Sequence, residues 1–230
     1  DILAVDLVEF AWNPYEENEL LITKYYPSFT TEVILLDVQT REQKELHVIP
    51  YVQWFSSNEI GYFNWNEEGA SLEAPIELYN LQTESKEQLI TGALLFTSIE
   101  NYFMYIQTND TALTFHFVTP DDHQEVGQLT IPQLSSNAGY VWTPFFDWVQ
   151  HTNTFFTFKP IKAESILEYK DGYELIAYDV EAGKITTIAH VDYLSPIECS
   201  PNGEKCLIGD RLDKMIKVRN GDIVSIVDEN

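Results

Sequence analysis

Three stretches of the chain share one pattern, which decides the fold: LLDVQTREQKEL at Leu35–Leu46, LYNLQTESKEQL at Leu78–Leu89 and AYDVEAGKITTI at Ala177–Ile188. In each stretch an apolar run ends at an Asp or Asn, a polar turn follows, and an apolar residue returns nine positions after that Asp or Asn. Short apolar runs rich in Val, Ile, Phe, Tyr and Thr and bounded by turn residues are typical of β-strands. Helix signals are nearly absent, so the chain is expected to repeat strand–turn–strand elements.

A second element also recurs. VEFAWNPYEENELLIT at Val8–Thr23 matches PIECSPNGEKCLIG at Pro196–Gly209, and both predict a strand, a turn and a strand. Together the two elements make a unit of four short strands about every 45 residues, near the period of propeller blades. The sequence therefore predicts an all-β fold, a β-propeller of four-stranded antiparallel blades.

Five blades are recognisable, at residues 7–50, 51–91, 92–135, 140–191 and 194–227, within a single domain that covers residues 1–230. Residues 1–6 contain Ile2–Val5, which aligns with Thr187–His190, the outermost strand that precedes a blade. This strand either closes the ring or belongs to a blade whose other strands lie upstream. Because a ring must close to hide its sheet edges, either five blades close here or the chain is most of a six-bladed ring.

The turns Trp12-Asn13-Pro14 and Cys199–Gly203 are followed by Leu-Leu-Ile or Cys-Leu-Ile, and this element resembles the strand–Ser-Pro-Asp-Gly–strand unit of TolB-like propellers. With its Tyr-Asp-Val-x-x-Gly strand ends, the whole chain resembles the YqgU-like propeller proteins of Gram-positive bacteria. The resemblance implies a six-bladed ring. It also implies an extracytoplasmic protein associated with the cell envelope, since the group consists largely of envelope lipoproteins without an assigned activity.

The charge of the chain excludes several partners. Its 230 residues include 13 Lys and Arg against 37 Asp and Glu, a formal net charge of −24. Such a surface repels phosphate backbones and anionic lipids, so nucleic-acid binding and a polybasic membrane patch are not expected. Much of the charge falls in turns such as Glu16-Glu17 and Glu67-Glu68, which favours a solvated exterior and a monomer. Adaptation to high salt explains the acidity equally well.

Membrane attachment is expected only at the periphery, if at all. No apolar run approaches the roughly 18 residues of a spanning helix. The chain begins at Asp1 rather than Met, so a signal peptide, a propeptide or another amino-terminal region is expected to have been removed or left out. An attachment would use a lipid anchor in that absent region.

Carboxylates in the first strands of the blades are the catalytic candidates. In a propeller these strands line the central channel, and strand alternation places Glu9 on the face opposite Phe10. The matching positions in later blades are Gln53, Asp147 and Glu198. Converging carboxylates raise one another's pKa and either bind a cation or divide into an acid and a base, as in glycosidases with carboxyl groups roughly 5–9 Å apart.

Aromatic residues outside the expected strands are the ligand-binding candidates. Trp65 lies in a loop, as does Tyr25-Tyr26-Pro27, while Tyr140 and Trp142 lie between blades. Loop aromatics beside carboxylates suit a sugar face or a cationic peptide, and Gln53 would add a polar contact from the channel. Alternatively, these rings fold back onto their own blades.

The two cysteines, Cys199 and Cys206, flank one predicted turn. A two-residue turn would place them opposite each other, close enough for a disulfide, whereas a three-residue loop would shift the register and leave two buried thiols. No Cys-x-x-Cys pair, zinc set, His-Glu-x-x-His motif, calcium loop or glycine-rich phosphate loop occurs, so neither a metal nor a cofactor is expected.

These features predict a non-enzymatic extracytoplasmic propeller that acts as a binding or scaffolding module for a protein or a cell-wall glycan. The alternative is a glycosidase-like hydrolase that uses Glu9, Asp147 and Glu198. The position of these three carboxylates relative to one another separates the two hypotheses.

Overall fold

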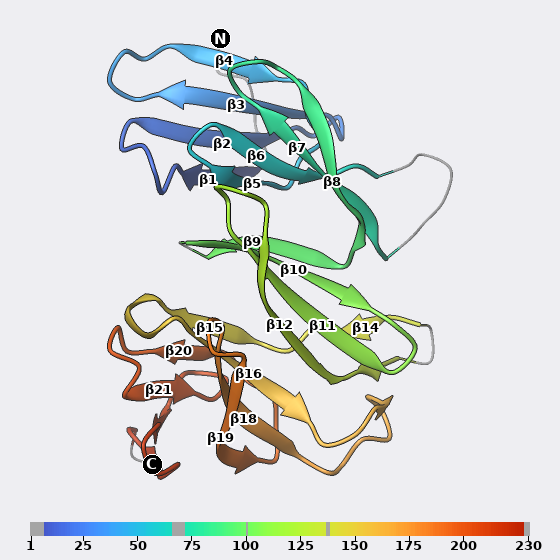
Figure 1. Ribbon diagram of the computed structural model, residues 1–230, viewed down its shortest axis with the longest axis vertical. Coiled ribbons are helices and arrows are strands. Elements are labelled where there is room, and N and C mark those ends of the chain that lie inside the picture. Colours follow the sequence, from blue (N-terminus) through green and yellow to red (C-terminus); the bar gives the residue numbers. More distant parts are fainter. Residues whose placement is uncertain (1–6, 66–71, 100, 137–138, 228–230) are drawn as a thin grey trace. The chain divides into compact units, whose positions relative to one another are not determined.

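The computed structural model describes residues 7–65, 72–99, 101–136 and 139–227, so the expected strand Ile2–Val5 and the acidic pair Glu67-Glu68 lie outside the described residues. The described chain consists of strands joined by turns, with one short 3-10 turn at Gln150–Thr152 (Figure 1). Within these ranges no helix is long and apolar enough to cross a membrane.

Five sheets have four strands each, and in every one the strands lie side by side in chain order. The first three sheets are β1 (Leu7–Trp12), β2 (Glu19–Tyr25), β3 (Thr31–Asp37) and β4 (Gln43–Leu46); β5 (Val52–Ser56), β6 (Glu59–Phe63), β7 (Ala74–Asn80) and β8 (Lys86–Ala93); and β9 (Leu95–Ile99), β10 (Tyr102–Thr108), β11 (Ala112–Val118) and β12 (Glu125–Pro132). The other two are β15 (Phe146–Val149), β16 (Thr154–Pro160), β18 (Tyr173–Asp179) and β19 (Lys184–Val191); and β20 (Ile197–Cys199), β21 (Lys205–Ile208), β22 (Lys214–Lys217) and β23 (Ile223–Ser225). The predicted all-β fold of four-stranded antiparallel sheets is confirmed.

The three repeated stretches form the turns between the third and fourth strands of their sheets. The seventh residue of each stretch has a left-handed backbone, with φ of 65° at Arg41, 57° at Glu84 and 63° at Gly183. The Arg41 N–H donates to the Asp37 carbonyl at 2.8 Å, and the Glu84 N–H donates to the Asn80 carbonyl at 2.9 Å. The Asp37 side chain accepts two further backbone N–H groups at 2.8 Å each. Such a side chain favours the turn locally, which explains why Asp or Asn recurs there.

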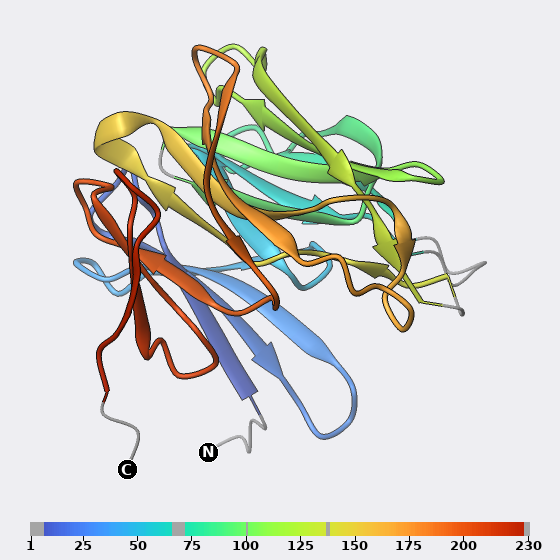
Figure 2. The same cartoon turned by 90° about the horizontal axis from the view of Figure 1, so that it is seen from below.

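The chain divides into two compact units, residues 1–103 with 120–122 and residues 104–119 with 123–230. In the first unit, the first and second sheets share an apolar core. The strands of the first sheet, in blue, lie next to one another in Figure 1 and Figure 2. The buried residues of this core are Leu21, Val33, Leu46, Val52, Trp54, Ile60, Tyr62 and Tyr79. This core packs the first sheet against the second, and Trp54 Nε1 on β5 donates to the Ala11 carbonyl on β1 at 3.0 Å.

The second unit has its own core between the fourth and fifth sheets. Its largest buried members include Phe156, Phe158, Leu175, Ile208 and Ile216. This unit also contains a small sheet that the sequence did not predict, in the order β14 (Val141–Trp142), β13 (Leu134–Ser135), β17 (Glu164–Ser165). Two-residue strands show no hydrophobic periodicity, and β13 pairs with β17 in parallel across a long connection, so local patterns cannot reveal them.

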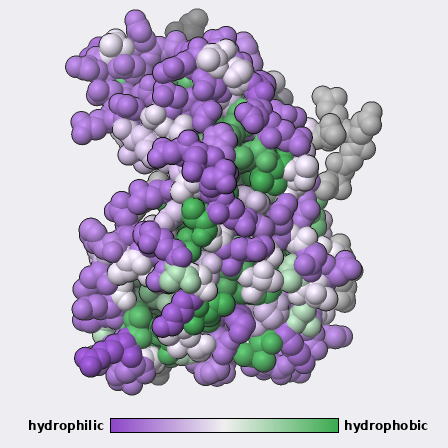
Figure 3. Space-filling view, viewed as in Figure 1, coloured by the Kyte–Doolittle hydropathy of each residue, from purple (hydrophilic) through white to green (hydrophobic). Residues whose placement is uncertain are grey.

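The described surface is mostly hydrophilic on the face shown in Figure 3. Glu16 and Glu17 are exposed in the loop between β1 and β2, as expected for charges that keep a protein soluble.

Candidate functional site

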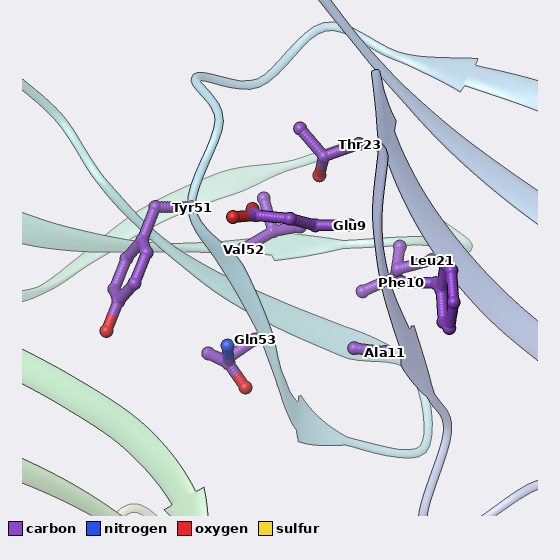
Figure 4. Close-up of a pocket in the computed structure, with 8 residues that line it drawn as sticks. All are labelled: Glu9, Phe10, Ala11, Leu21, Thr23, Tyr51, Val52 and Gln53. Atoms are coloured by element: carbon purple, nitrogen blue, oxygen red, sulfur yellow. The ribbon is translucent and has the colours of Figure 1, made fainter. Parts of the chain in front are cut away.

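A pocket of about 180 Å³ lies between β1 and β5 in the first unit (Figure 4). Its walls are formed by Glu9, Phe10, Ala11, Leu21, Thr23, Tyr51, Val52 and Gln53. The side chains of Glu9, Tyr51 and Gln53 lie on one side of β1, whereas the Phe10 ring points away on the other side (Figure 4). Two residues that the sequence assigned to the channel, Glu9 and Gln53, therefore line the same pocket.

The Glu9 carboxylate is held by the neighbouring strand. Glu9 pairs with Thr23 across β1 and β2, so Tyr25, two residues further along β2, lies on the same face of the sheet. The Tyr25 hydroxyl donates to Glu9 Oε2 at 2.8 Å. Burial, and then this hydrogen bond to Glu9, raise the pKa of Tyr25 to about 12. Tyr25 therefore stays a neutral donor at physiological pH.

Tyr51 has the unusual backbone of the pocket. It directly precedes β5 with a φ of 72°, a left-handed conformation that is rare for a bulky residue. Its hydroxyl donates to the Phe96 carbonyl at 3.0 Å. Its ring lies 5.7 Å from that of Phe63 and 5.1 Å from that of Phe96. Burial, and secondarily the charge of Glu9, raise the pKa of Tyr51. Contacts of the side chain thus fix this ring at the pocket wall.

Trp65, one of the predicted aromatic contacts, continues this group of rings. Its ring centroid lies 5.3 Å from that of Phe63, which also contacts the rings of Tyr51 and Phe96. Trp65 remains 40% exposed. The predicted loop tryptophan therefore packs on the ring that supports the pocket and still presents a face to solvent.

The other two candidate carboxylates belong to the second unit. Asp147 Oδ2 accepts the Cys199 N–H at 2.5 Å, and Asp147 Oδ1 accepts the Trp148 N–H at 2.8 Å. Both oxygens therefore stabilise the backbone, one of them between β15 and β20. Glu198 lies exposed on β20. A joint site of these two residues with Glu9 stays a prediction, because Glu9 belongs to the first unit.

The two cysteines form a disulfide in the structure. Cys199 lies directly opposite Cys206 in the pairing of β20 with β21. Between them, the Ser200 N–H donates to the Lys205 carbonyl at 2.7 Å, which leaves the four loop residues 201–204. An even number of loop residues keeps the register of a two-residue turn, and this explains why the sulfur atoms meet.

The remaining aromatic candidates belong to the second unit, Trp142 on β14 and Tyr140 directly before that strand. Tyr140 is 62% exposed and Trp142 47% exposed. The Tyr140 N–H donates to Ser136 Oγ at 3.1 Å. Among the described residues, no group of three or more His, Cys, Asp or Glu side chains is placed to hold a metal ion.

Sequence reasoning missed Tyr51 and Thr23. Thr23 could have been found from the pairing of the first two strands, since it lies opposite Glu9. Tyr51 carries no local signal, because its conformation depends on Phe63 and Phe96, which are distant in the chain. Its place directly before the predicted channel strand was the only hint.

Comparison with known proteins agrees with this architecture. The model of the YqgU-like 6-bladed beta propeller domain matches residues 2–209. The uncharacterized lipoprotein YqgU of Bacillus subtilis (strain 168) is 20% identical over 223 residues, which are 96% of this chain and 60% of that protein. The chain thus spans about 60% of the length of this curated relative.

Solved structures show the same fold. The uncharacterized protein lmo1340 from Listeria monocytogenes EGD-e has a TM-score of 0.83 at 22% identity, covering 96% of this chain and 67% of that one. TolB from Acinetobacter baumannii has a TM-score of 0.52 at 9% identity, covering 95% of this chain and 56% of that one. At these identities the likeness concerns the fold alone. With the family match over most of its length, the chain belongs to the family of YqgU-like 6-bladed beta propeller domains.

Proposed function

We propose that this chain is a non-enzymatic, extracytoplasmic binding propeller whose pocket beside Glu9 takes one residue of a peptide or of a cell-wall glycan. The observation that carries the proposal is Tyr51, held in a left-handed conformation at the wall of a pocket that also contains Glu9 and Gln53. A strained residue of this kind costs about 1–3 kcal/mol and tends to be kept at ligand sites. Here the surrounding rings maintain it.

The size of the pocket limits its ligand. A dry cavity of about 150 Å³ is large enough for benzene, whereas drug-sized ligands need about 300–1,000 Å³. The 180 Å³ beside Glu9 therefore suits a single side chain or a single sugar ring. A polymer that inserts one residue and lies across the surrounding surface fits this volume better than a whole metabolite.

The mixture of polar and apolar groups also favours binding. The carboxylate of Glu9, the hydroxyl of Thr23 and the amide of Gln53 can orient a ligand, while Leu21 and Tyr51 supply apolar surface. Walls that combine apolar surface with a few placed polar groups are typical of binding sites. The extracytoplasmic location is supported by the curated relative, which is called a lipoprotein.

The test is binding to purified peptidoglycan, measured by cosedimentation, and to soluble peptidoglycan fragments, measured by calorimetry. We expect Tyr51→Ala and Gln53→Ala each to weaken binding about tenfold, equivalent to about 1.4 kcal/mol. Phe29→Ala is the control, because Phe29 is 99% exposed in the hairpin between β2 and β3. Chromatography of the recovered fragments should show them uncleaved.

Two results would contradict the proposal. If both pocket variants bind like the wild type, the ligand does not use this pocket. If the fragments are cleaved, and cleavage is lost in Glu9→Gln, the protein is a hydrolase.

A further inference from the structure

The charges around the pocket are one-sided. Glu9 is the only Asp, Glu, Lys, Arg or His among the eight described residues that line it. The nearest base on β2, Lys24, sits one residue beyond Thr23 and therefore on the opposite face of the strand. Lys24 is also paired with Glu32 at 3.2 Å. Among the described residues of β1, β2 and β5, no cation thus competes for the Glu9 carboxylate.

The Glu9 carboxylate has capacity left for a ligand. An ionised carboxylate can accept about four hydrogen bonds. Among the described residues, Tyr25 is its hydrogen-bond partner, through Oε2 at 2.8 Å, and no Lys, Arg or His lies within ion-pair distance of Glu9. Glu9 is exposed on β1 rather than sealed in the core, so a ligand can reach it without a conformational change.

The aromatic wall favours the same kind of ligand. A cation within about 6 Å of a Tyr ring is attracted by the negative face of that ring. The Tyr51 ring is held at the wall by Phe63 and Phe96, and Tyr51 lines the same pocket as Glu9. Burial, and secondarily the charge of Glu9, raise the pKa of Tyr51. Leu21 and Val52 complete an apolar lining that suits a short hydrocarbon stem.

We propose that the pocket binds a protonated amine: an ammonium group that pairs with Glu9, contacts the Tyr51 ring and carries a short apolar or sugar stem. The inference rests on the proposed function and names the ligand class of the same site. Two sources share this chemistry, a lysine-like side chain of a peptide and an amino sugar with a free amine. An anionic ligand is excluded by Glu9 and by the net charge of −24.

The experiment follows the backbone amide signals of Ala11, Val52 and Gln53 by NMR in the full chain labelled with ¹⁵N. The probes are n-butylammonium chloride and 1-butanol for the side-chain source, and glucosamine and N-acetylglucosamine for the sugar source. We expect saturable shifts with at least one of the two amines, and affinities at least about tenfold weaker for its neutral partner. Which amine binds more tightly identifies the source.

Two variants that each remove one negative charge test whether the amine binds at Glu9. Glu9→Gln should weaken amine binding about tenfold or more, whereas Glu17→Gln, with the same charge change on an exposed loop, should keep the wild-type affinity within about twofold. Because the comparison of amine with neutral probe uses the wild type alone, it remains decisive even if a variant folds poorly.

Three outcomes would overturn the inference. If the neutral probes bind as tightly as the amines, the pocket does not select for charge, although the proposed function survives. If Glu9→Gln and Glu17→Gln weaken amine binding equally, only the net charge attracts the amines. If none of the probes shifts these signals, the pocket does not take an ammonium group, and the proposed function is then decided separately by peptidoglycan binding of Tyr51→Ala.

Discussion

Among the described residues of the first unit, left-handed non-glycine residues occur in the repeated hairpin turns, at Phe29 and at Tyr51. The hairpin turns and Tyr51 adopt this conformation for different reasons. In the repeated hairpin turns, Arg41 and Glu84 are held by backbone hydrogen bonds to Asp37 and Asn80. The same position in the second unit is Gly183, so the turn requires the conformation and not a particular side chain. Tyr51 instead owes its conformation to its own ring and hydroxyl. A left-handed residue therefore indicates a site only when its side chain, rather than its turn, holds it in place.

The largest effect is expected when the support of Tyr51 is removed. Phe96 is fully buried, and its ring lies 5.1 Å from Tyr51 and 4.6 Å from Phe63. Truncation of a buried Phe to Ala costs about 3–5 kcal/mol. We expect Phe96→Ala to lower the free energy of unfolding by that amount in guanidinium denaturation, because the ring cluster loses its centre.

A matched control uses the same residue type. Phe29 is 99% exposed, so Phe29→Ala should change the free energy of unfolding by less than about 0.5 kcal/mol. Equal effects of the two variants would mean that the ring cluster does not support the pocket, and the contrast with the turns would disappear.

Glycine substitutions are expected to change the free energy of unfolding by an intermediate amount, with opposite signs at Arg41 in the hairpin turn and at Tyr51. Arg41→Gly relieves backbone strain and loses no core contact, so we expect about 0.5–1 kcal/mol of stabilisation in urea denaturation. Tyr51→Gly relieves similar strain but removes the ring from Phe63 and Phe96. We expect it to destabilise the protein by about 1–2 kcal/mol, since partly buried ring contacts outweigh the strain.

Thr40 provides the control for these glycine variants. It lies in the same turn as Arg41 but outside the left-handed region, so Thr40→Gly should gain nothing and lose about 0.5–1 kcal/mol through the greater freedom of the unfolded chain. If Tyr51→Gly instead stabilises the protein as Arg41→Gly does, the backbone of Tyr51 is strained like that of an ordinary turn residue, and its ring does not stabilise the fold.

The same contrast explains what the sequence could predict. The hairpin turns of three sheets follow from local patterns, because Asp37 and Asn80 act on residues within four positions. Short apolar runs bounded by turn residues predict the strands of the five sheets. Strand alternation also assigned Glu9 and Gln53 to one surface, and both line the pocket.

What sequence reasoning missed depends on distant contacts. The conformation of Tyr51 relies on the Phe96 carbonyl, 45 residues away. The small sheet joins β13 to β17 across about thirty residues in parallel. Neither a pairing of two-residue strands nor a strained residue held by its ring leaves a periodic signal in the chain.

The smallest expected effect on stability is confined to alkaline pH, and it tests whether the hydrogen bond from the Tyr25 hydroxyl holds the Glu9 carboxylate in place. The pKa of Tyr25 is raised from its ordinary value of 10.0 to about 12. The folded state therefore gains a contribution to stability that is fully present below pH 10 and is lost as the pH rises from 10 to about 12.

Glu9→Gln removes the charge and weakens the hydrogen bond to Tyr25 but leaves burial, the larger cause of the raised pKa of Tyr25. We expect the pKa of Tyr25 to fall only part of the way, in an NMR titration of ¹³C-labelled tyrosines assigned with Tyr25→Phe. Tyr26, whose raised pKa comes first from its hydrogen bond to Glu32, should titrate as in the wild type. An unchanged pKa of Tyr25 in Glu9→Gln would mean that burial alone sets it, and that the carboxylate is not fixed at the pocket by this tyrosine.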